Sequence, residues 1–486
     1  MDRQEAERIY AAGKEVVIET LLQMDARIQE REKLEQRVIE LEQIVVRLTR
    51  NSTNSSRPPS SDPPWSKKEP SRKNPSKRKQ GGQPGHKGKK RELLPPEKVD
   101  KTHDIFPEQC ASCLCPFDQD LQIPSENPFR HQVTDLPPIV PVTTEYRCHS
   151  IRCSCGHQTV ASLPEEVAQS GFGPGVHALI AYLMAAHRVT RRGIVEIMAS
   201  IFGIKISTGG VCNVAERVSE ACVPVVEVIK KYIATAPVLN IDETGWKNKG
   251  KRCYLWTFVA LRAVFFLIAP NRSAQVLKDV LGEEFFGIMT SDDHSAYNSY
   301  QKKGIRQLCW PHLIRKLKAL KDGRSSTHAY CFARNILKDA GAIFSCWHAF
   351  KASGGSREQL WEKTLPHQER IRDLCEIFLY SKDPLVRTRA KKTLANWEHL
   401  FTFLKYEGVE PSNNSAEQKL RPAVQWRKIC FGSQSSTGER FTARLLSIIG
   451  TCRINGINPF HFLVEVVGSR FSDKHTVTTL PLHLPD

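Results

Sequence analysis

The 486-residue chain has no apolar run that approaches the roughly 20 residues of a membrane-spanning helix. Its first residues, MDRQEAERIY, lack the apolar core of a secretory signal peptide. Acidic residues are also scarce, with 52 Asp and Glu against 70 Lys and Arg. We therefore expect a cytoplasmic protein with no membrane partner. The net charge of +18 favours a polyanionic partner, nucleic acid rather than a membrane surface.

The composition is neither that of a disordered protein nor that of a disulfide framework. Hydrophobic residues make up 40% of the chain, which is sufficient for packed cores. The length predicts about two to four domains. The 15 cysteines are an odd number spread along a long chain. Their thiols are therefore expected to bind metal or to be buried, not to form disulfides.

The first segment, residues 1–50, has the composition of a helix. Spacings of four and three residues separate five apolar positions, Leu34, Val38, Leu41, Val45 and Leu48. This is the seam of a short coiled coil, and it would make the protein a homo-oligomer. The alternative is an amphipathic helix that packs on its own protein.

Residues 51–100 read as a linker that cannot hold a helix. It opens with NSTNSSRPPSSDPPW and continues into a basic tract, residues 67–91, with eleven Lys or Arg and a single acidic residue. Such a tract is expected to be disordered alone and to order on phosphates, with release of counterions. The residues predicted to contact DNA are Lys77, Arg78, Lys79, Lys87, Lys89, Lys90 and Arg91.

Residues 101–165 contain six of the cysteines and predict a zinc-finger-like module. Zn²⁺ prefers four soft ligands in a tetrahedron, commonly supplied by two short cysteine turns. The predicted ligands are Cys110, Cys113, Cys153 and Cys155. The second turn is one residue shorter than usual, and other cysteines and histidines nearby, Cys115, Cys148, His149 and His157, are alternative ligands. The competing interpretation is a set of reduced structural thiols.

Residues 170–232 read as helical throughout. Within them, RRGIVEIMASIFGIKISTGGVCNVAERV predicts a short helix, a turn at Phe202–Gly203 and a second helix entered through Ser207 and Thr208. This is the pattern of a helix-turn-helix, whose second helix enters the major groove of DNA. A helical hairpin without DNA contacts has the same pattern.

From residue 233 the pattern changes to strands. PVLNID, CYLWTFVAL and VFFLIAP predict three strands, SAQVLKDVLG a helix, and FFGIMTSDDHSAY a fourth strand with its exit. A short run, IRQLCW, predicts a fifth strand. This order opens a ribonuclease-H-like fold, so we predict a multidomain α/β protein with such a catalytic domain over residues 233–445. Residues 311–410 predict a helical insertion, and residues 446–486 a C-terminal cap and tail.

Two carboxylates are predicted at strand ends. Asp242 ends the first strand, and Asp292, with Asp293 beside it, ends the fourth. In a ribonuclease-H-like sheet these strands are neighbours, so both carboxylates reach one edge. Carboxylate oxygens suit Mg²⁺, and paired Mg²⁺ ions stabilise the attacking and leaving oxygens of a phosphoryl displacement. A third acid is expected on a helix after the insertion.

Several long motifs, in order along almost the whole chain, resemble transposases of the insertion sequence 66 family. The N-terminal motifs are NSTNSSRPPSSDPP and GGQPGHKG, followed by the cysteine region; the catalytic-core and C-terminal motifs are NIDETGW, SDDHSAY, CWPHLIRKL, NNSAEQKLRPAVQWRKICFGS and GTCRINGINPF. The resemblance implies a catalytic Asp–Asp–Glu triad of Asp242, Asp292 and Glu417, with Mg²⁺ or Mn²⁺ as cofactor. Asp292 is preferred over Asp293 because the family's acid directly precedes a variable pair and then x-Ala-Tyr, and DHSAY follows Asp292 in this way.

The resemblance further implies a transposase that binds the ends of an insertion sequence, cleaves DNA there and transfers the freed strand to a target. Accessory proteins of the same element are implied as partners, as is a homo-oligomer on DNA. Arg421, Arg427 and Lys428 are expected to contact phosphates near the site. The alternatives are a nuclease of the same fold without strand transfer, and a DNA-binding regulator with an inactive core.

Each acid also has a structural interpretation. Asp242 and Asp292 are able to cap turns, and Glu417 follows Asn414 by three residues, the spacing of a helix capping box, and precedes Arg421 by four. Cys309-x-x-His312 offers two metal ligands, which do not make a site on their own. A role for this pair at a strand–helix junction is the simpler interpretation.

Overall fold

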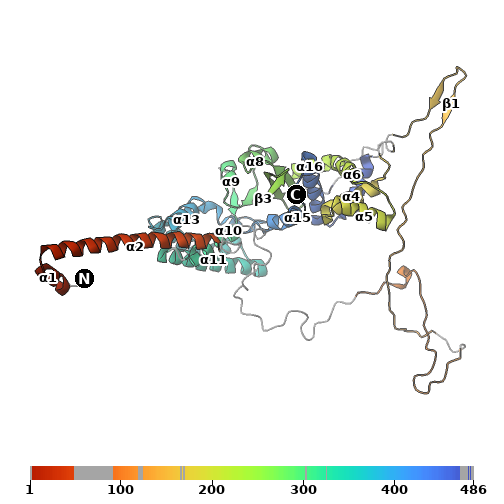
Figure 1. The fold of residues 1–486 in the computed structure, drawn as a ribbon. Coiled ribbons are helices and arrows are strands. Elements are labelled where there is room, and N and C mark those ends of the chain that lie inside the picture. The colour runs from red at the N-terminus through yellow and green to blue at the C-terminus, as the bar shows by residue number, and fades with distance from the viewer. Residues whose placement is uncertain are drawn as a thin grey trace. The chain divides into compact units, whose positions relative to one another are not determined.

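The computed structural model describes residues 3–48, 91–118, 124–164, 167, 170–301, 304–323, 326–470, 480 and 482. Most of the basic tract therefore lies outside the described residues. Within them the protein is a mixed α/β structure (Figure 1). None of the described helices is both long enough and apolar enough to cross a membrane.

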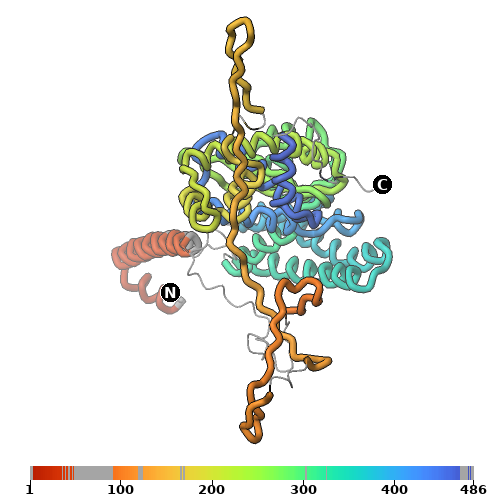
Figure 2. The backbone as a smooth tube through the Cα atoms, turned by 90° about the vertical axis from the view of Figure 1, so that its right-hand side faces the viewer, coloured from red at the N-terminus to blue at the C-terminus, as the bar shows by residue number. Residues whose placement is uncertain are grey.

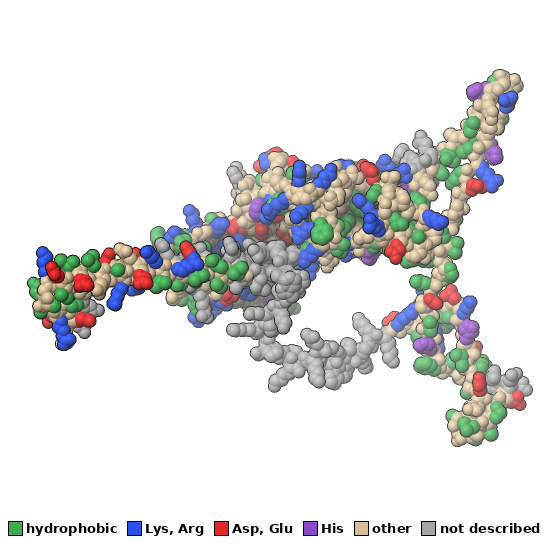
Figure 3. All heavy atoms as spheres, in the orientation of Figure 1, with side chains coloured by type: hydrophobic (Ala, Val, Ile, Leu, Met, Phe, Trp, Pro, Cys, Tyr) green, Lys and Arg blue, Asp and Glu red, His purple; other side chains and the backbone are tan. Residues whose placement is uncertain are grey.

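The N-terminal segment consists of two helices, α1 (Arg3–Ala11) and α2 (Lys14–Leu48), separated at Gly13, whose φ of 107° only glycine adopts readily. The predicted seam lies on α2, and its side chains are exposed, from 47% for Leu41 to 74% for Leu48. Figure 3 shows apolar side chains along the visible face of this helix. A partner helix would find the whole seam accessible.

The cysteine-rich region has little regular structure. The 3-10 turn η2 (Pro96–Lys98) precedes it, and its described residues include a two-stranded antiparallel hairpin, β1 (Ser150–Arg152) and β2 (Gln158–Val160). All six residues of the hairpin strands are exposed. The two strands therefore bury no apolar surface among the described residues.

Four helices precede the sheet: α4 (Pro174–His187), α5 (Arg191–Phe202), α6 (Thr208–Ala221) and α7 (Val223–Thr235). The turn before α6 has the predicted form, because Ser207 caps the helix by accepting a hydrogen bond from the Gly210 N–H. One face of α6, including Val211, Val214 and Val218, is fully buried. The last of the described helices, α17 (Pro459–Arg470), packs on α4.

A five-stranded mixed sheet forms the centre, in the order β5-β4-β3-β6-β7. Its strands are β3 (Val238–Asn248), β4 (Lys251–Val259), β5 (Val264–Ala269), β6 (Ile288–Ser291) and β7 (Arg306–Leu308). The first three pair as antiparallel neighbours, whereas β6 runs parallel to both β3 and β7. The short helices α8 (Ala274–Leu281) and α9 (Ser295–Tyr300) flank β6 in the chain.

Both edges of the sheet are covered. Along β5, the N–H groups of Val264 and Phe266 donate to the hydroxyls of Thr451 and Ser447 on α16 (Ser436–Ile454). Along β7, the hydroxyl of Thr402, in α14 (Thr402–Lys405), donates to the Arg306 carbonyl. These contacts satisfy backbone groups that an open edge would leave free to pair with another chain.

The stretch predicted as a helical insertion contains four long helices: α10 (Trp310–Gly323), α11 (Thr327–Ser353), α12 (Arg357–Phe378) and α13 (Pro384–Ala395). They stack side by side (Figure 2) and, with the short η4 (Trp397–His399), share one apolar core. This core also includes Ile288 and Leu308, so it is continuous with the β6–β7 side of the sheet.

The structure corrects one detail of the predicted strands. Asp242 does not end its strand, because β3 continues to Asn248 and turns through Lys249 and Gly250 into β4. Only the parallel pairing with β6 stops earlier, at Asn240 opposite Thr290. Asp242 therefore follows the last residue pair of the parallel ladder while still pairing with Thr257 of β4.

Candidate active site at the edge between β3 and β6

The three predicted acids come from three elements. Asp242 lies within β3, Asp292 directly follows β6, and Glu417 lies in the first turn of α15 (Asn414–Cys430). Since β3 and β6 are parallel neighbours, both chains leave their ladder at the same edge of the sheet. All three residues are partly buried.

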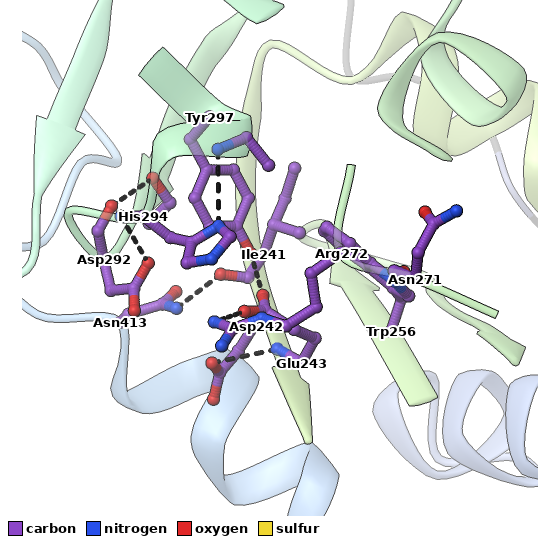
Figure 4. A network of polar contacts seen from close by, with 12 residues as sticks. Ile241, Asp242, Glu243, Trp256, Asn271, Arg272, Asp292, His294, Tyr297 and Asn413 are labelled. Carbon is purple, nitrogen blue, oxygen red and sulfur yellow. Dashed lines mark hydrogen bonds and ion pairs between the residues drawn. The ribbon is translucent and has the colours of Figure 1, made fainter. Parts of the chain in front are cut away.

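Asp292 and Asp293 have different surroundings. The Asp292 carboxylate accepts a hydrogen bond of 3.0 Å from the His294 N–H, as in a turn cap (Figure 4). The Asp293 carboxylate instead lies 3.7 Å from the Nζ atom of Lys316 on α10. Asp293 thus has a cation as its neighbour, whereas Asp292 adds its negative charge to Asp242.

The position of Glu417 depends on contacts that fix α15 against β3. At its start, the Asn413 amide donates to the Ile241 carbonyl over 2.6 Å (Figure 4). At its end, Ser433 exchanges backbone hydrogen bonds with Lys247 and Lys249. The preceding Gly432 must lack a Cβ, because that atom would lie 2.2 Å from the Lys247 carbonyl oxygen. Glu417 is therefore held beside β3 by residues on both sides of it.

The capping-box interpretation of Glu417 does not hold. The residue at the N-cap is Asn413 rather than Asn414, and it makes no side-chain cap hydrogen bond. Its amide is committed to Ile241 instead. The Glu417 side chain is directed toward α10, where its Oε1 lies 3.8 Å from Nδ1 of His312.

Cys309, His312 and Glu417 form the one close group of three potential metal ligands in the described part of the chain, and neither Asp242 nor Asp292 belongs to it. One ligand atom from each residue lies within 4.8 Å of the other two. Nδ1 of His312 is buried without a hydrogen-bond partner among the described residues. Cys309 does serve the strand–helix junction, since its Sγ accepts from the Asn413 N–H. Glu417 adds a third potential ligand that the Cys309-x-x-His312 spacing does not reveal.

The electrostatics of the site are those of uncompensated negative charge. Burial raises the pKa of Asp242 well above its usual value, and the charges of Glu243, Asp292 and Glu417 raise it further. Burial also raises the pKa of the Cys309 thiol to about 12. No ion pair to Asp242 is formed by any described residue. A cation placed among these acids would favour their charged forms.

Glu243, adjacent in sequence, is used differently. Successive residues of a strand face opposite sides of the sheet, so its side chain leaves Asp242 and enters the α8–α9 side. There it accepts hydrogen bonds from Arg272 and from the Tyr297 hydroxyl, and only 1% of the side chain is exposed. Figure 4 shows this second network beside the first. The sequence alone does not distinguish the two acids of this pair.

The chain was compared with known proteins. The profile described as "Transposase IS66 family" matches residues 169–440, more than half of the chain, and the match includes all three acids. The chain belongs to the IS66 transposase family. A second profile, for a family of unknown function (DUF6444), matches residues 4–92 of this transposase.

The curated relatives that match this transposase are uncharacterized proteins of Sinorhizobium fredii (strain NBRC 101917 / NGR234). Protein y4hP is 24% identical over 80% of this chain and 75% of its own length. Protein y4jD is 22% identical over 58% of this chain and 60% of its own length. Protein y4qI is 24% identical over 45% of this chain and 44% of its own length.

The predicted zinc ligands of this transposase lie in two tight turns, each considered separately. In the first, the Cys110 N–H donates to the Cys115 carbonyl, and hydrogen bonds from backbone groups of Cys113 and Ser112 lower the pKa of Cys110. In the second, which joins β1 to β2, hydrogen bonds from Cys155 lower the pKa of Cys153. Both turns therefore favour thiolates, the form that binds metal.

The residues expected to contact DNA are of two kinds. Arg421, Lys428 and Arg91 are exposed, although Arg91 donates to the Thr134 hydroxyl. Arg427 is partly buried, and its Nη1 donates to the Thr244 hydroxyl and the Gly245 carbonyl of β3. Arg427 therefore helps to hold α15 on the sheet. The other predicted contacts, Lys77 to Lys90, lie outside the described residues.

Proposed function

We propose that this transposase is of the Asp–Asp–Glu type, with Asp242, Asp292 and Glu417 as its catalytic acids. The observation that carries the proposal is the placement of Asp242 and Asp292 where the parallel strands β3 and β6 leave their ladder, with Glu417 held beside β3 and no ion pair to Asp242 from any described residue. The strand order, with one parallel and one antiparallel neighbour for β3, supports a ribonuclease-H-like catalytic domain over residues 233–445.

Mg²⁺ or Mn²⁺ fits this donor set, because hard divalent ions take carboxylate oxygens. When bound, such an ion lowers the pKa of water and stabilises the charge of a transferring phosphoryl group. Asp242, Asp292 and Glu417 would hold it, and the contacts of Asn413 and Ser433 keep the acid of α15 in place. The buried Tyr297–Glu243–Arg272 network supports β3 from the other side.

In the proposed reaction, water attacks the phosphodiester at the end of the element, the bond to the 3′ oxygen breaks, and a 3′-hydroxyl is freed. That hydroxyl then attacks a phosphodiester of the target, displacing its 3′ oxygen as the leaving group. Neither step forms a covalent bond to the enzyme. Residues 67–91 and the helix beginning at Thr208 are proposed to hold the DNA, the first through phosphates and the second in the major groove.

The test is an assay with DNA carrying the ends of the element, a supercoiled target and Mg²⁺, with and without the accessory proteins of the element. We expect nicked ends and joined products. Cleaved ends that are never joined would indicate a nuclease without strand transfer. Binding of the ends with neither product would indicate a regulator with an inactive core.

We further propose that residues 101–165 form a zinc-binding module with Cys110, Cys113, Cys153 and Cys155 as ligands. The lowered pKa of Cys110 and of Cys153 supports this assignment. Protein purified without chelator should contain about one zinc per chain, since such modules use four ligands per ion. Cys113→Ser should lose it, whereas Cys331→Ser, on α11, should not. Elemental analysis without zinc would contradict the proposal.

A further inference from the structure

A pocket opens next to the acids, on the side of the helical insertion. Cys309 and His312 line it as well as contacting Glu417, and Asp293 lines it from the exit of β6. The remaining polar wall comes from α10 and α13. The pocket therefore neighbours the candidate active site through Cys309, His312 and Asp293, although most of its charged residues belong to the insertion.

Three cations line this pocket against a single acid. Lys316 comes from α10, and Arg389 and Lys392 come from α13. Lys316 lies 3.7 Å from Asp293, which leaves two cationic side chains in excess. Burial lowers the pKa of Lys316, and the charges of Arg389 and Lys392 lower it further, against the opposing effect of Asp293. The cations thus repel one another, and a bound anion would relieve this repulsion.

The helix α13 presents its basic residues selectively. Arg389 and Lys392 are three residues apart and share one stripe of the helix, Asn396 directly follows the helix, and all three line the pocket. Arg389 is partly buried. Burial lowers the pKa of its guanidinium, and the negative charge of Asp293 partly offsets this effect. Lys391, the next residue on the same helix, is exposed and does not line the pocket. The positive charge at the pocket therefore comes from the stripe that contains Arg389 and Lys392, and not from α13 as a whole.

From this arrangement we infer that Lys316, Arg389 and Lys392 bind a backbone phosphate of the DNA strand on which the acids act. The inference rests on the proposed function, which places a phosphodiester at Asp242, Asp292 and Glu417. A strand continuing from that point carries a further phosphate at each nucleotide, and the acids repel it. The pocket supplies the compensating charge next to them and makes the insertion part of the substrate site.

The test measures DNA affinity by the full-length protein with Ca²⁺ in place of Mg²⁺, so that binding is separated from cleavage. The probe is a short duplex carrying the end of the element, titrated over a salt series. Arg389→Gln with Lys392→Gln should weaken binding about tenfold, as expected for one charge-assisted phosphate contact. The slope of log affinity against log salt should fall by about 0.9. Lys391→Gln, with the same change in charge, should leave both values unchanged.

A second arm locates the phosphate. A neutral methylphosphonate is placed at each position of the duplex in turn. One position should weaken binding by the wild type but not by the double variant. Lys392→Gln alone, at an exposed residue, repeats the comparison without disturbing the core. Equal losses for Lys391→Gln and Lys392→Gln, or methylphosphonate effects that persist undiminished in the double variant, would overturn the inference.

The two proposals fail in different ways. If the wild type shows the single sensitive phosphate but never cleaves with Mg²⁺, the phosphate pocket stands and the catalytic proposal falls. If the wild type cleaves and no phosphate is coupled to Arg389 and Lys392, the catalytic acids stand and the pocket does not bind the strand.

Discussion

Asp242 at the edge of the sheet and Asp339 in the helical insertion are both shielded from solvent, but their electrostatics are opposite. Asp339 lies on α11 and pairs with Arg370 and His367 of α12, at 2.7 and 2.8 Å. Burial opposes its charge, but these partners more than offset it, and the pKa of Asp339 is lowered. Asp242 has acids as neighbours, and its pKa is raised.

The difference indicates that Asp339 stabilises the fold through its ion pairs, whereas Asp242 does not. A charged group in a protein interior is expensive unless it is paired, so the pair on α11 and α12 stabilises the insertion. The cluster at Asp242 costs stability in the absence of a cation. Functional sites often contain such destabilising charge clusters, because a bound ligand compensates the repulsion. The contrast with Asp339 therefore favours a metal site at Asp242.

The largest effect is expected on catalysis. Asp242→Asn, Asp292→Asn and Glu417→Gln should each reduce metal-dependent DNA cleavage by about a hundredfold or more, because each removes a charge that stabilises the reacting centre. DNA binding in Ca²⁺ should remain. Asp339→Asn and Asp293→Asn are the matched controls, and both should still cleave. If Asp292→Asn still cleaves DNA and Asp293→Asn does not, the catalytic acid is Asp293 and the assignment to Asp292 is wrong.

The next largest effect is stabilisation by the metal. Mn²⁺ or Mg²⁺ at about one hundred times its dissociation constant should raise the free energy of unfolding by about 2.7 kcal/mol. Asp242→Asn should abolish this increment, while Asp339→Asn should preserve it. Denaturant titrations with and without the ion measure both. An equal increment in the two variants would mean that the ion binds somewhere other than the acids.

A smaller effect should distinguish the two acids without metal. Asp339→Asn should lower the free energy of unfolding by about 2 kcal/mol, since it removes hydrogen bonds to a charged group and leaves Arg370 without its partner. Asp242→Asn should leave it unchanged or raise it, because a repelled charge is lost. Urea titrations in chelator-treated buffer make the comparison. Similar decreases in the free energy of unfolding of both variants would mean that Asp242 and Asp339 stabilise the fold equally.

The smallest effect is on the pH dependence of stability. The folded-state pKa of Asp339 is lowered, so its contribution is present above its unfolded value of about 3.9 and is lost as the pH falls below it. The folded-state pKa of Asp242 is raised, so stability is gained as the pH falls through that higher pKa. Urea titrations of the wild type and of each Asn variant over a pH series measure the two effects. Asp339→Asn should remove only the change at acidic pH, and Asp242→Asn only the change near its own higher pKa. If both variants changed the free energy of unfolding over the same pH range, the assignment would be contradicted.

Much of the sheet was predictable, because hydrophobic runs bounded by turn residues identify strands through local properties. The runs beginning at Pro237, Cys253 and Val264 each became a strand. The end of β3 was misjudged at Asp242 because polar residues follow it, and β4 continues to pair with them through Asn248. Pairing partners are a tertiary property, so polarity alone did not reveal the boundary.

The sequence by itself determined that this protein is a basic, multidomain transposase and which three acids are the candidates, since motif order and composition are carried by the chain directly. Only the tertiary structure decided how neighbouring residues divide their roles. Asp242 and Glu243 lie on opposite faces of one strand, so one joins the acid cluster and the other pairs with Arg272. Likewise, Glu417 meets Cys309 and His312 across about a hundred residues of insertion because α15 is fixed to β3. Such contacts depend on packing between distant segments, which no local pattern specifies.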